Sequence, residues 1–325
     1  MRDKILIIGG NGYIGHEVQK KLNLYYDLIS CDILLYSKIV DKKKIIKNTK
    51  NLVVKNFKNL NSKFLSCFDY VIILAGLVGD PISKKYQKLS KKNDFDDMKK
   101  LIIKISKLKI KKAIFVSTCS NYGIHDGKIL LKENAKLRPL SLYAKSKVKI
   151  EKFILSLKKS SNTQFTILRF ATAYGLSEGR MRFDLTVNQF ILEAMTKREL
   201  VIYDKNTIRP YCHVKDFSNI IYRIIKTKNK LTNFQVFNCG FNNSNYSKKN
   251  IVELIKKYLE IDFKIKFVNY SKDKRNYKVD FSKLKKKIKI NSIVNKKQAF
   301  SEIKKFIQKN KSAKFSKMGN YKVYL

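Results

Sequence analysis

The chain has 325 residues, of which 44% are hydrophobic and 30% charged, so it can bury a sizeable core and is not a disordered chain. Its formal net charge at pH 7 is +46, mostly from Lys spread over every segment, which argues against the local Arg-rich patch of a specific nucleic-acid binder. The longest apolar run, residues 71–78, is too short to cross a bilayer, and the scattered cysteines form no disulfide framework, so we expect a cytoplasmic protein with reduced, mostly buried thiols and no membrane insertion.

Short apolar runs alternate with helical patterns over the first half of the chain. Six runs predict strands, at residues 5–8, 27–31, 52–54, 70–74, 113–116 and 166–168. Helical spacing covers residues 13–22, and longer helices are predicted over 83–108 and 141–158. This alternation predicts an α/β fold, a Rossmann-type doubly wound parallel sheet, in which ligands bind beyond the carboxyl ends of the strands.

The alternation stops after the sixth strand. A glycine-bearing loop at 174–183 leads to a predicted helix at 184–196, a second helix at 211–225 returns to the first domain, and a strand follows at 234–238. The chain ends in a polar stretch, which we expect to be a loosely held tail. The predicted parts are a cofactor-binding domain of 1–170 with about 211–240, a smaller C-terminal α/β substrate-binding domain of 171–210 with 241–310, and a tail of 311–325.

A glycine-rich segment lies between the first predicted strand and the first predicted helix. Gly9, Gly12 and Gly15 form a G-x-x-G-x-x-G pattern, and the segment also fits G-x-G-x-x-G from Gly10. Glycine allows a tight turn, close approach of the backbone to a diphosphate and close packing of helix on strand, while the helix N-terminus offers N–H groups to phosphates. Because the pattern follows a buried strand, it predicts a dinucleotide-binding turn.

A carboxylate, Asp32, follows the second predicted strand. Such a group accepts hydrogen bonds from both adenosine ribose hydroxyls and repels a 2′-phosphate, so it favours NAD over NADP. Small residues after the fourth strand would allow a close approach to the same cofactor. The residues expected at NAD are Gly9, Gly12, Tyr13, Ile14, Gly15, Asp32, Leu74, Ala75, Gly76 and Lys147.

Tyr143 and Lys147 open the helix after the fifth strand and share one helical face. The lysine charge, helped by NAD⁺, can lower the pKa of the phenol, which then takes a proton from a hydroxyl whose carbon gives up hydride. Thr118, at the end of the fifth strand, can hydrogen-bond the same oxygen. These three features converge at the carboxyl edge of one sheet, and we expect them to be the catalytic residues.

Several segments together resemble the extended short-chain dehydrogenase/reductases of the nucleotide-sugar epimerase/dehydratase family. The matching segments are Asp32 and residues 9–15, 74–76, 117–123, 143–147, 168–175 and 209–216. The likeness runs from the start to about residue 290. It implies that Thr118, Tyr143 and Lys147 form the catalytic triad and that the substrate is a nucleotide-sugar.

The resemblance also implies substrate contacts. Arg209 matches an arginine that usually grips the substrate diphosphate, for which a guanidinium is well suited, and Arg275 is a second candidate. The segment from Arg180 to Asn188 resembles a signature of a subgroup that handles bacterial surface sugars, which makes Arg182 and Asn188 candidate contacts. Thr118 and Thr172 are expected at the sugar, and Thr172 stands where galactose epimerases commonly carry Asn.

Departures from the family pattern bear on the reaction. Relatives that dehydrate at C4–C6 carry Asp-Glu after the catalytic Thr, whereas Cys119 and Ser120 stand here and cannot serve as that acid/base pair. Either Asn93 or Asp94 takes the place of an Asn that supports the active-site water chain. The leading interpretation is therefore an NAD-dependent C4 epimerase for surface-polysaccharide sugars. The alternatives are a net 4-dehydrogenase or reductase, a 4,6-dehydratase, and a non-catalytic Rossmann-fold protein that binds RNA or membrane.

Two further expectations concern partners. Extended family members usually dimerise through a four-helix contact, which implies a homodimer formed by the helices at 83–108 and 141–158. The three histidines, His16, His125 and His213, are not at metal-ligand spacing, so no protein-bound metal is expected.

Overall fold

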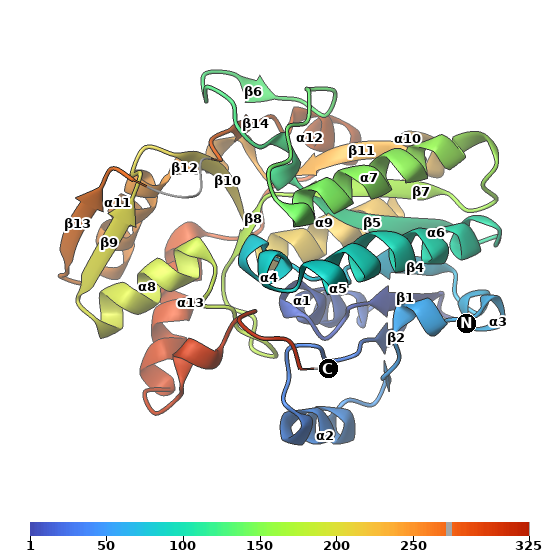
Figure 1. Cartoon of the computed structure of the whole chain (residues 1–325), viewed down its shortest axis with the longest axis horizontal. Coiled ribbons are helices and arrows are strands. Elements are labelled where there is room, and N and C mark those ends of the chain that lie inside the picture. The colour runs from blue at the N-terminus through green and yellow to red at the C-terminus, as the bar shows by residue number, and fades with distance from the viewer. Residues whose placement is uncertain (271–274, 325) are drawn as a thin grey trace.

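The computed structural model describes residues 1–270 and 275–324. Figure 1 shows a parallel sheet with helices on both faces, and a second, smaller lobe on the left that is built from later segments of the chain. The strands of the main sheet are all parallel and lie in the order β11 (Gln235–Cys239), β7 (Phe165–Phe170), β5 (Lys112–Thr118), β4 (Tyr70–Ile73), β1 (Lys4–Ile8), β2 (Asp27–Cys31) and β3 (Leu52–Val53). The predicted α/β fold class is confirmed.

Both faces of this sheet are buried, which explains why its strands are almost continuously apolar. In β1, Ile5 and Ile7 pack on one face while Leu6 and Ile8 pack on the other. The first face is covered by α1 (Tyr13–Leu22), α9 (Val214–Lys226) and α12 (Ser282–Ile288). The second face is covered by α3 (Ser62–Leu65), α6 (Met98–Ser106) and α7 (Leu142–Ser156).

The second lobe has its own apolar core, in which Ile191, Ile255 and Phe300 are fully or almost fully buried. Its helices are α8 (Thr186–Thr196), α11 (Lys248–Leu259) and α13 (Lys296–Lys309). Its strands are β8 (Thr172–Tyr174), β10 (Ile208–His213) and β12 (Asn245–Ser247) in one sheet, and β9 (Glu199–Tyr203) with β13 (Lys264–Val268) in another.

The remaining elements are short or peripheral. They are α2 (Ile39–Asn48), α10 (Asn229–Thr232), the pair β6 (Leu130–Leu131) and β14 (Lys278–Val279), and the 3-10 turns η1 (Phe57–Asn59), η3 (Cys119–Tyr122), η4 (Leu157–Lys159), η5 (Asn242–Ser244) and η6 (Phe315–Lys317).

The single helix predicted over residues 83–108 is wrong. The structure forms α4 (Asp80–Lys85), α5 (Gln87–Lys91), the π-helical η2 (Lys92–Asp97) and α6. The first break falls at Tyr86, whose backbone is not helical (φ −119°, ψ 56°). The wider η2 turn buries Asn93 and Asp94, which places polar side chains on the inner face of the segment.

The helix predicted over residues 211–225 begins later than expected. Residues 211–213 belong to β10, because Tyr211, Cys212 and His213 pair with β8. The helix α9 starts at Val214, where the ring of His213 accepts a hydrogen bond from the Lys215 backbone N–H (3.1 Å). Helix α9 packs on α1 in the core on one face of the main sheet.

The C-terminal stretch, expected to be a loosely held tail, instead packs against the body of the chain. The Asn320 side chain donates to the Val78 carbonyl oxygen (3.0 Å), and the Tyr324 N–H donates to the Leu35 carbonyl oxygen (2.8 Å). Val323 is buried beside Leu77. Composition alone missed these contacts because each depends on a segment far away in the sequence.

Candidate active site

A cavity of about 660 Å³ lies at the carboxyl edge of the main sheet, between the sheet and the second lobe. The turn after β1 and the residues that follow β2, β4 and β5 line one side, and the loop before α8 lines another. Asn320 and Tyr321 of the C-terminal stretch complete the lining. Every residue predicted for NAD, catalysis or substrate lines this cavity except Asn188.

Steric contacts require glycine in the turn between β1 and α1. Gly9 has φ +85°, and a Cβ atom there would lie 2.7 Å from the Ala75 backbone nitrogen. A Cβ atom on Gly15 would overlap the Gly10 carbonyl oxygen. No side chain caps the start of α1 at Gly12, so the first turn keeps its backbone N–H groups for another acceptor. This cradle fits a diphosphate.

Asp32 lies at the next corner of the cavity, directly after β2. Its carboxylate accepts hydrogen bonds from the backbone N–H groups of Asn11 (3.0 Å) and Leu34 (2.8 Å). Burial raises the pKa of this carboxyl above its usual value, and the two N–H donors act in the opposite direction. A carboxylate fixed beside the glycine cradle is suited to the adenosine ribose of NAD.

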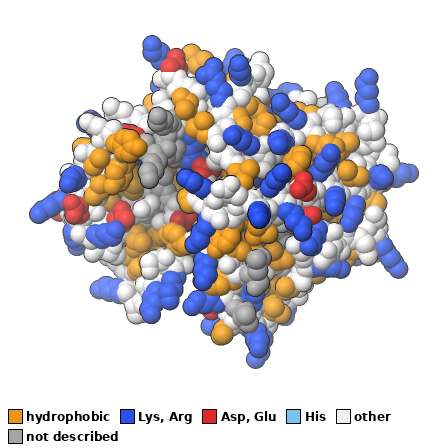
Figure 2. Space-filling view, viewed as in Figure 1, with side chains coloured by type: hydrophobic (Ala, Val, Ile, Leu, Met, Phe, Trp, Pro, Cys, Tyr) orange, Lys and Arg blue, Asp and Glu red, His pale blue; other side chains and the backbone are white. Residues whose placement is uncertain are grey.

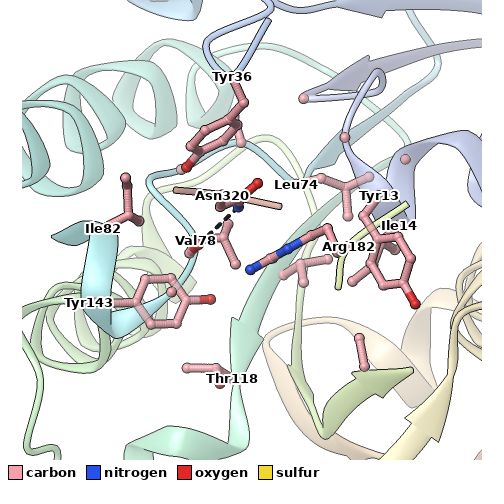
Figure 3. Close-up of a pocket in the computed structure, with 18 of the residues that line it drawn as sticks. Tyr13, Ile14, Tyr36, Leu74, Val78, Ile82, Thr118, Tyr143, Arg182 and Asn320 are labelled. Atoms are coloured by element: carbon pink, nitrogen blue, oxygen red, sulfur yellow. Dashed lines mark hydrogen bonds between the residues drawn. The ribbon is translucent and has the colours of Figure 1, made fainter. Parts of the chain in front are cut away.

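The predicted catalytic residues come together in the same cavity. Tyr143 lies in the first turn of α7, which Ser141 caps by accepting the Ala144 N–H (3.2 Å). Figure 3 shows the Tyr143 hydroxyl directed into the cavity above Thr118, at the end of β5. One turn later on α7, Lys147 donates to the Val116 carbonyl oxygen (2.8 Å) and lies 5.9 Å from the centre of the Tyr143 ring.

Burial shifts the pKa values of Tyr143 and Lys147. It raises the pKa of the Tyr143 phenol well above its usual value, and the nearby carboxylates of Asp94 and Asp80 act in the same direction. It lowers the pKa of the Lys147 amine to about 8, although Asp94 acts in the opposite direction. The phenol therefore needs additional positive charge to ionise near neutral pH, and a bound nicotinamide cation would supply it.

The sequence left open whether Asn93 or Asp94 serves the site, and in the structure Asn93 lines the cavity whereas Asp94 is buried close to it. Its carboxylate is buried on η2, where it accepts hydrogen bonds from the Leu77 N–H (2.9 Å) and the Ser90 hydroxyl (2.8 Å). It lies beside Gly76, whose Cβ position is 3.3 Å from Asp94 Oδ1 and 3.9 Å from Lys147 Nζ. A buried anion thus shares the neighbourhood of the catalytic lysine.

Four arginines line the cavity, and three of them are the arginines predicted to contact the substrate. Arg182 forms an ion pair with Asp184 (2.6 Å), and Figure 3 shows its guanidinium reaching across the cavity towards Val78. Arg275 forms an ion pair with Asp80 and lies near the Ser120 hydroxyl (3.4 Å). Arg209, on β10, also lines the cavity, as does Thr172 at the start of β8.

Asn188, predicted to contact the substrate, has a different role in the structure. Its side chain is fully buried and accepts the Gly175 N–H (3.0 Å) while donating to the Tyr13 hydroxyl and the Arg182 carbonyl oxygen. These contacts explain why the segment around Arg182 is fixed in place. Asn188 is therefore positioned to hold two cavity-lining residues.

Sequence reasoning missed several residues that line the cavity. They include Tyr36, Asp80, Arg180, Asn320 and Tyr321. Arg180 stands in the same Arg-x-Arg segment as Arg182, which was the available signal. The others come from the loop after β2, from the start of α4 and from the C-terminal stretch, and no local pattern indicates that these segments meet.

Other features bear on the expected partners. Figure 2 shows Lys and Arg side chains dispersed over the visible face rather than gathered in one patch. All five cysteines are free thiols, and four are buried while Cys67 is exposed. None of the helices in the described part of the chain has the length and apolar character of a membrane span. Within the same residues, no His, Cys, Asp and Glu side chains form a group of three or more that could hold a metal ion.

The fold and the cavity define a Rossmann-type nucleotide-binding enzyme. A family model described as "NAD dependent epimerase/dehydratase family" matches residues 5–240, well over half of the chain. The chain belongs to this family, and it is an NAD-dependent enzyme of the extended short-chain dehydrogenase/reductase type. The predicted family and cofactor are confirmed.

Individual proteins are similar to this chain in sequence or in fold. The chain is 27% identical over 278 residues to a UDP-glucose 4-epimerase of Lactobacillus helveticus, covering 80% of this chain and 82% of the relative. Its fold matches that of a UDP-N-acetylglucosamine 4-epimerase from Methanobrevibacter ruminantium M1 with a TM-score of 0.82 and 24% identity, over 95% and 99% of the two chains. It also matches the NDP-hexosamine 5,6-dehydratase TunA with a TM-score of 0.81 and 21% identity, over 97% and 99%.

Proposed function

We propose that this enzyme epimerises C4 of the sugar in a nucleotide-diphosphate sugar through a transient 4-keto intermediate. One observation carries the proposal: Tyr143, Lys147 and Thr118 line the same cavity as the glycine turn and Asp32. The relatives named as 4-epimerases support C4 as the carbon that reacts.

In this mechanism the chain's own residues move one proton. NAD⁺, when bound, supplies a hydride acceptor that can return the hydride to the sugar. Tyr143 takes the proton of the 4-hydroxyl as the C4–H bond breaks, and Lys147 stabilises the phenolate by its positive charge. Thr118 holds the reacting oxygen by a hydrogen bond. After the keto sugar has rotated to present its other face, Tyr143 returns the proton to the C4 oxygen, which gives the opposite epimer.

The second lobe is proposed to hold the nucleotide-sugar, while the sheet domain holds NAD. Arg209 and Arg275 are suited to the substrate diphosphate because a guanidinium offers paired donors to phosphate oxygens. Thr172 and Arg182 lie nearer the sugar in this arrangement. Arg275 would exchange its ion pair with Asp80 for the substrate phosphate.

Among the described residues that follow Thr118, none supplies the acid/base pair that 4,6-dehydration needs. Cys119 is buried with its thiol directed at the Arg169 carbonyl oxygen, and Ser120 carries only a hydroxyl. Three carboxylates line the cavity: Asp32 is held by backbone N–H groups beside the glycine turn, and Asp80 and Asp184 are each ion-paired with an arginine. Epimerisation remains the reaction that the residues present can perform with least rearrangement.

The decisive test is incubation of the purified chain in D₂O with a panel of UDP-, GDP- and dTDP-sugars, followed by mass spectrometry and NMR. A C4 epimerase gives a product of unchanged mass, with its original hydrogen at C4 and no net NADH. A net dehydrogenase gives a keto sugar with one NADH for each turnover, and a dehydratase gives a product lighter by one water. Either of the last two results would refute the proposal.

Three wider assignments follow from the same proposal. We propose a cytoplasmic enzyme that prepares sugars for surface polysaccharides. We also propose that it forms a homodimer through the outer faces of α7 and the α5–α6 segment. Light scattering of the purified chain, of 38.0 kDa, checks the dimer.

A further inference from the structure

The C-terminal stretch, residues 318–324, crosses the cavity and joins its two sides. On the second lobe, the Met318 carbonyl oxygen accepts the Phe183 N–H (2.7 Å). On the sheet side, Asn320 donates to the Val78 carbonyl oxygen, a bond drawn in Figure 3. Figure 1 shows the same stretch running from α13 back towards the sheet. This stretch therefore spans the two parts that enclose the cavity.

Asn320 also holds Arg180, which the proposed mechanism does not use. Arg180 Nη2 donates to Asn320 Oδ1 (2.9 Å), and its guanidinium lies 4.9 Å from the centre of the Tyr36 ring. The preceding residue, Gly179, packs directly against the His16 ring in the first turn of α1. Arg180 is thus placed between the start of α1 and the loop after β2, and it lines the same cavity as the glycine turn.

Within the described part of the chain, no carboxylate forms an ion pair with Arg180, although the charges of Asp32 and Asp184 act on it from a greater distance. Ion pairs join Arg182 to Asp184 and Arg275 to Asp80, whereas no carboxylate of the described residues lies within 4.0 Å of the Arg180 guanidinium. Burial and the charge of Arg182 lower the pKa of Arg180 below its usual value. A half-buried cation without a paired anion favours an anionic ligand at this place.

We propose that Arg180, held by Asn320, binds the diphosphate of NAD from the side opposite to the glycine turn, so that residues 318–324 complete the cofactor site. Besides Asn320, Arg182 and Asp184, the neighbours of Arg180 are His16, Tyr36 and Asp32, and these last three come from the sheet domain. Arg209 and Arg275 were assigned to the substrate diphosphate. The geometry therefore points to the cofactor diphosphate, and the inference rests on the NAD site described above.

The test compares ligands with and without phosphate on the full chain freed of bound nucleotide. Arg180→Gln is titrated by calorimetry with ADP-ribose and with adenosine, beside Arg223→Gln, which removes the same charge from an exposed position on α9. We expect Arg180→Gln to weaken the binding of ADP-ribose by about tenfold or more and to leave the affinity for adenosine unchanged. Arg223→Gln is expected to change neither.

Unchanged ADP-ribose affinity in Arg180→Gln would overturn the proposal, and so would equal losses for ADP-ribose and adenosine, which would indicate only a damaged fold. Asn320→Ala provides an independent check, since it leaves Arg180 in the chain. We expect it to speed the exchange of bound NAD for labelled NAD, and an unchanged rate would refute the role of residues 318–324. No turnover is measured, so these outcomes are separate from those for epimerisation.

Discussion

Tyr143 is the residue on which the proposed chemistry depends most directly, because its hydroxyl is directed into the cavity near Thr118. Tyr143→Phe keeps the ring and its packing but removes the proton acceptor. We expect kcat to fall by roughly 10²- to 10⁴-fold while the NAD content of the purified protein stays the same. Turnover of the preferred nucleotide-sugar and the nucleotide released on denaturation check this. Tyr222→Phe, on α9, is the matched control, and wild-type activity in Tyr143→Phe would remove the assigned role.

Asp94 acts on the pKa values of both groups that the proposed proton transfer depends on. Its carboxylate raises the pKa of Tyr143 and also acts to raise that of Lys147, which burial lowers to about 8. Asp94→Asn removes this charge with little change of shape, so both pKa values should fall. Glu151 keeps its own effect on Lys147. We expect the whole pH profile of kcat to move to lower pH, by on the order of half a unit to one unit.

The exposed Asp96, on the same π-helical turn, offers a matched control for this shift. Asp96→Asn removes an equal charge and should leave the profile in place. A profile of Asp94→Asn that moves to higher pH, or on one limb only, would contradict the assigned electrostatic role. A loss of activity at every pH without a shift would instead indicate that Asp94 serves only to hold Leu77 and Ser90.

At the scale of elements, a buried ion pair fastens α7 to the main sheet. Glu151 on α7 accepts hydrogen bonds from Arg169 on β7 (2.7 Å), from Asn121 (2.7 Å) and from Ser117. Both charged side chains are almost fully buried, at 2% and 4% exposure. Glu151→Gln leaves the Arg169 charge without its partner, so we expect a loss of about 3–5 kcal/mol in the free energy of unfolding.

Urea unfolding measures this loss. The control is Glu253→Gln, which breaks an exposed ion pair with Lys249 and should change stability by about 0.5 kcal/mol or less. Glu151→Leu combined with Arg169→Met should recover part of the stability, because it removes both buried charges. Equal stabilities of Glu151→Gln and Glu253→Gln would show that the buried pair does not fasten the helix.

Local patterns predicted the elements whose determinants lie within a few residues. The strands of the main sheet are continuous apolar runs, and the glycine turn carries its own steric signal, so both could be read directly. The segment after β4 could not be predicted in this way. The break at Tyr86 and the π-helical turn around Asp94 depend on packing against α7 and the cavity, which no local pattern shows. Likewise, residues 211–213 are strand because β8 lies beside them, which overrides their local preference.

At the scale of the whole molecule, the cavity is assembled from segments that lie far apart in the sequence. Asp32, Tyr143, Arg182 and Asn320 line the same cavity although almost 300 residues separate the first from the last. The sequence placed the first two by their position after a strand and at the start of a helix. It could not place Asn320, or assign Asn188 to the support of Tyr13, because those contacts arise only once the two lobes pack.

The net charge of +46 gives the last prediction, since it acts through the whole molecule. A positive field concentrates anionic nucleotide-sugars near the cavity, and salt screens it over about 8 Å at physiological ionic strength. Raising NaCl from about 20 to 500 mM shortens this screening distance further. It should therefore lower kcat/KM several-fold and leave kcat nearly constant. Steady-state assays in NaCl and in potassium acetate check this, because a shared ionic-strength dependence distinguishes screening from chloride competition. A kcat/KM that is independent of both salts would show that the lysines contribute nothing to substrate capture.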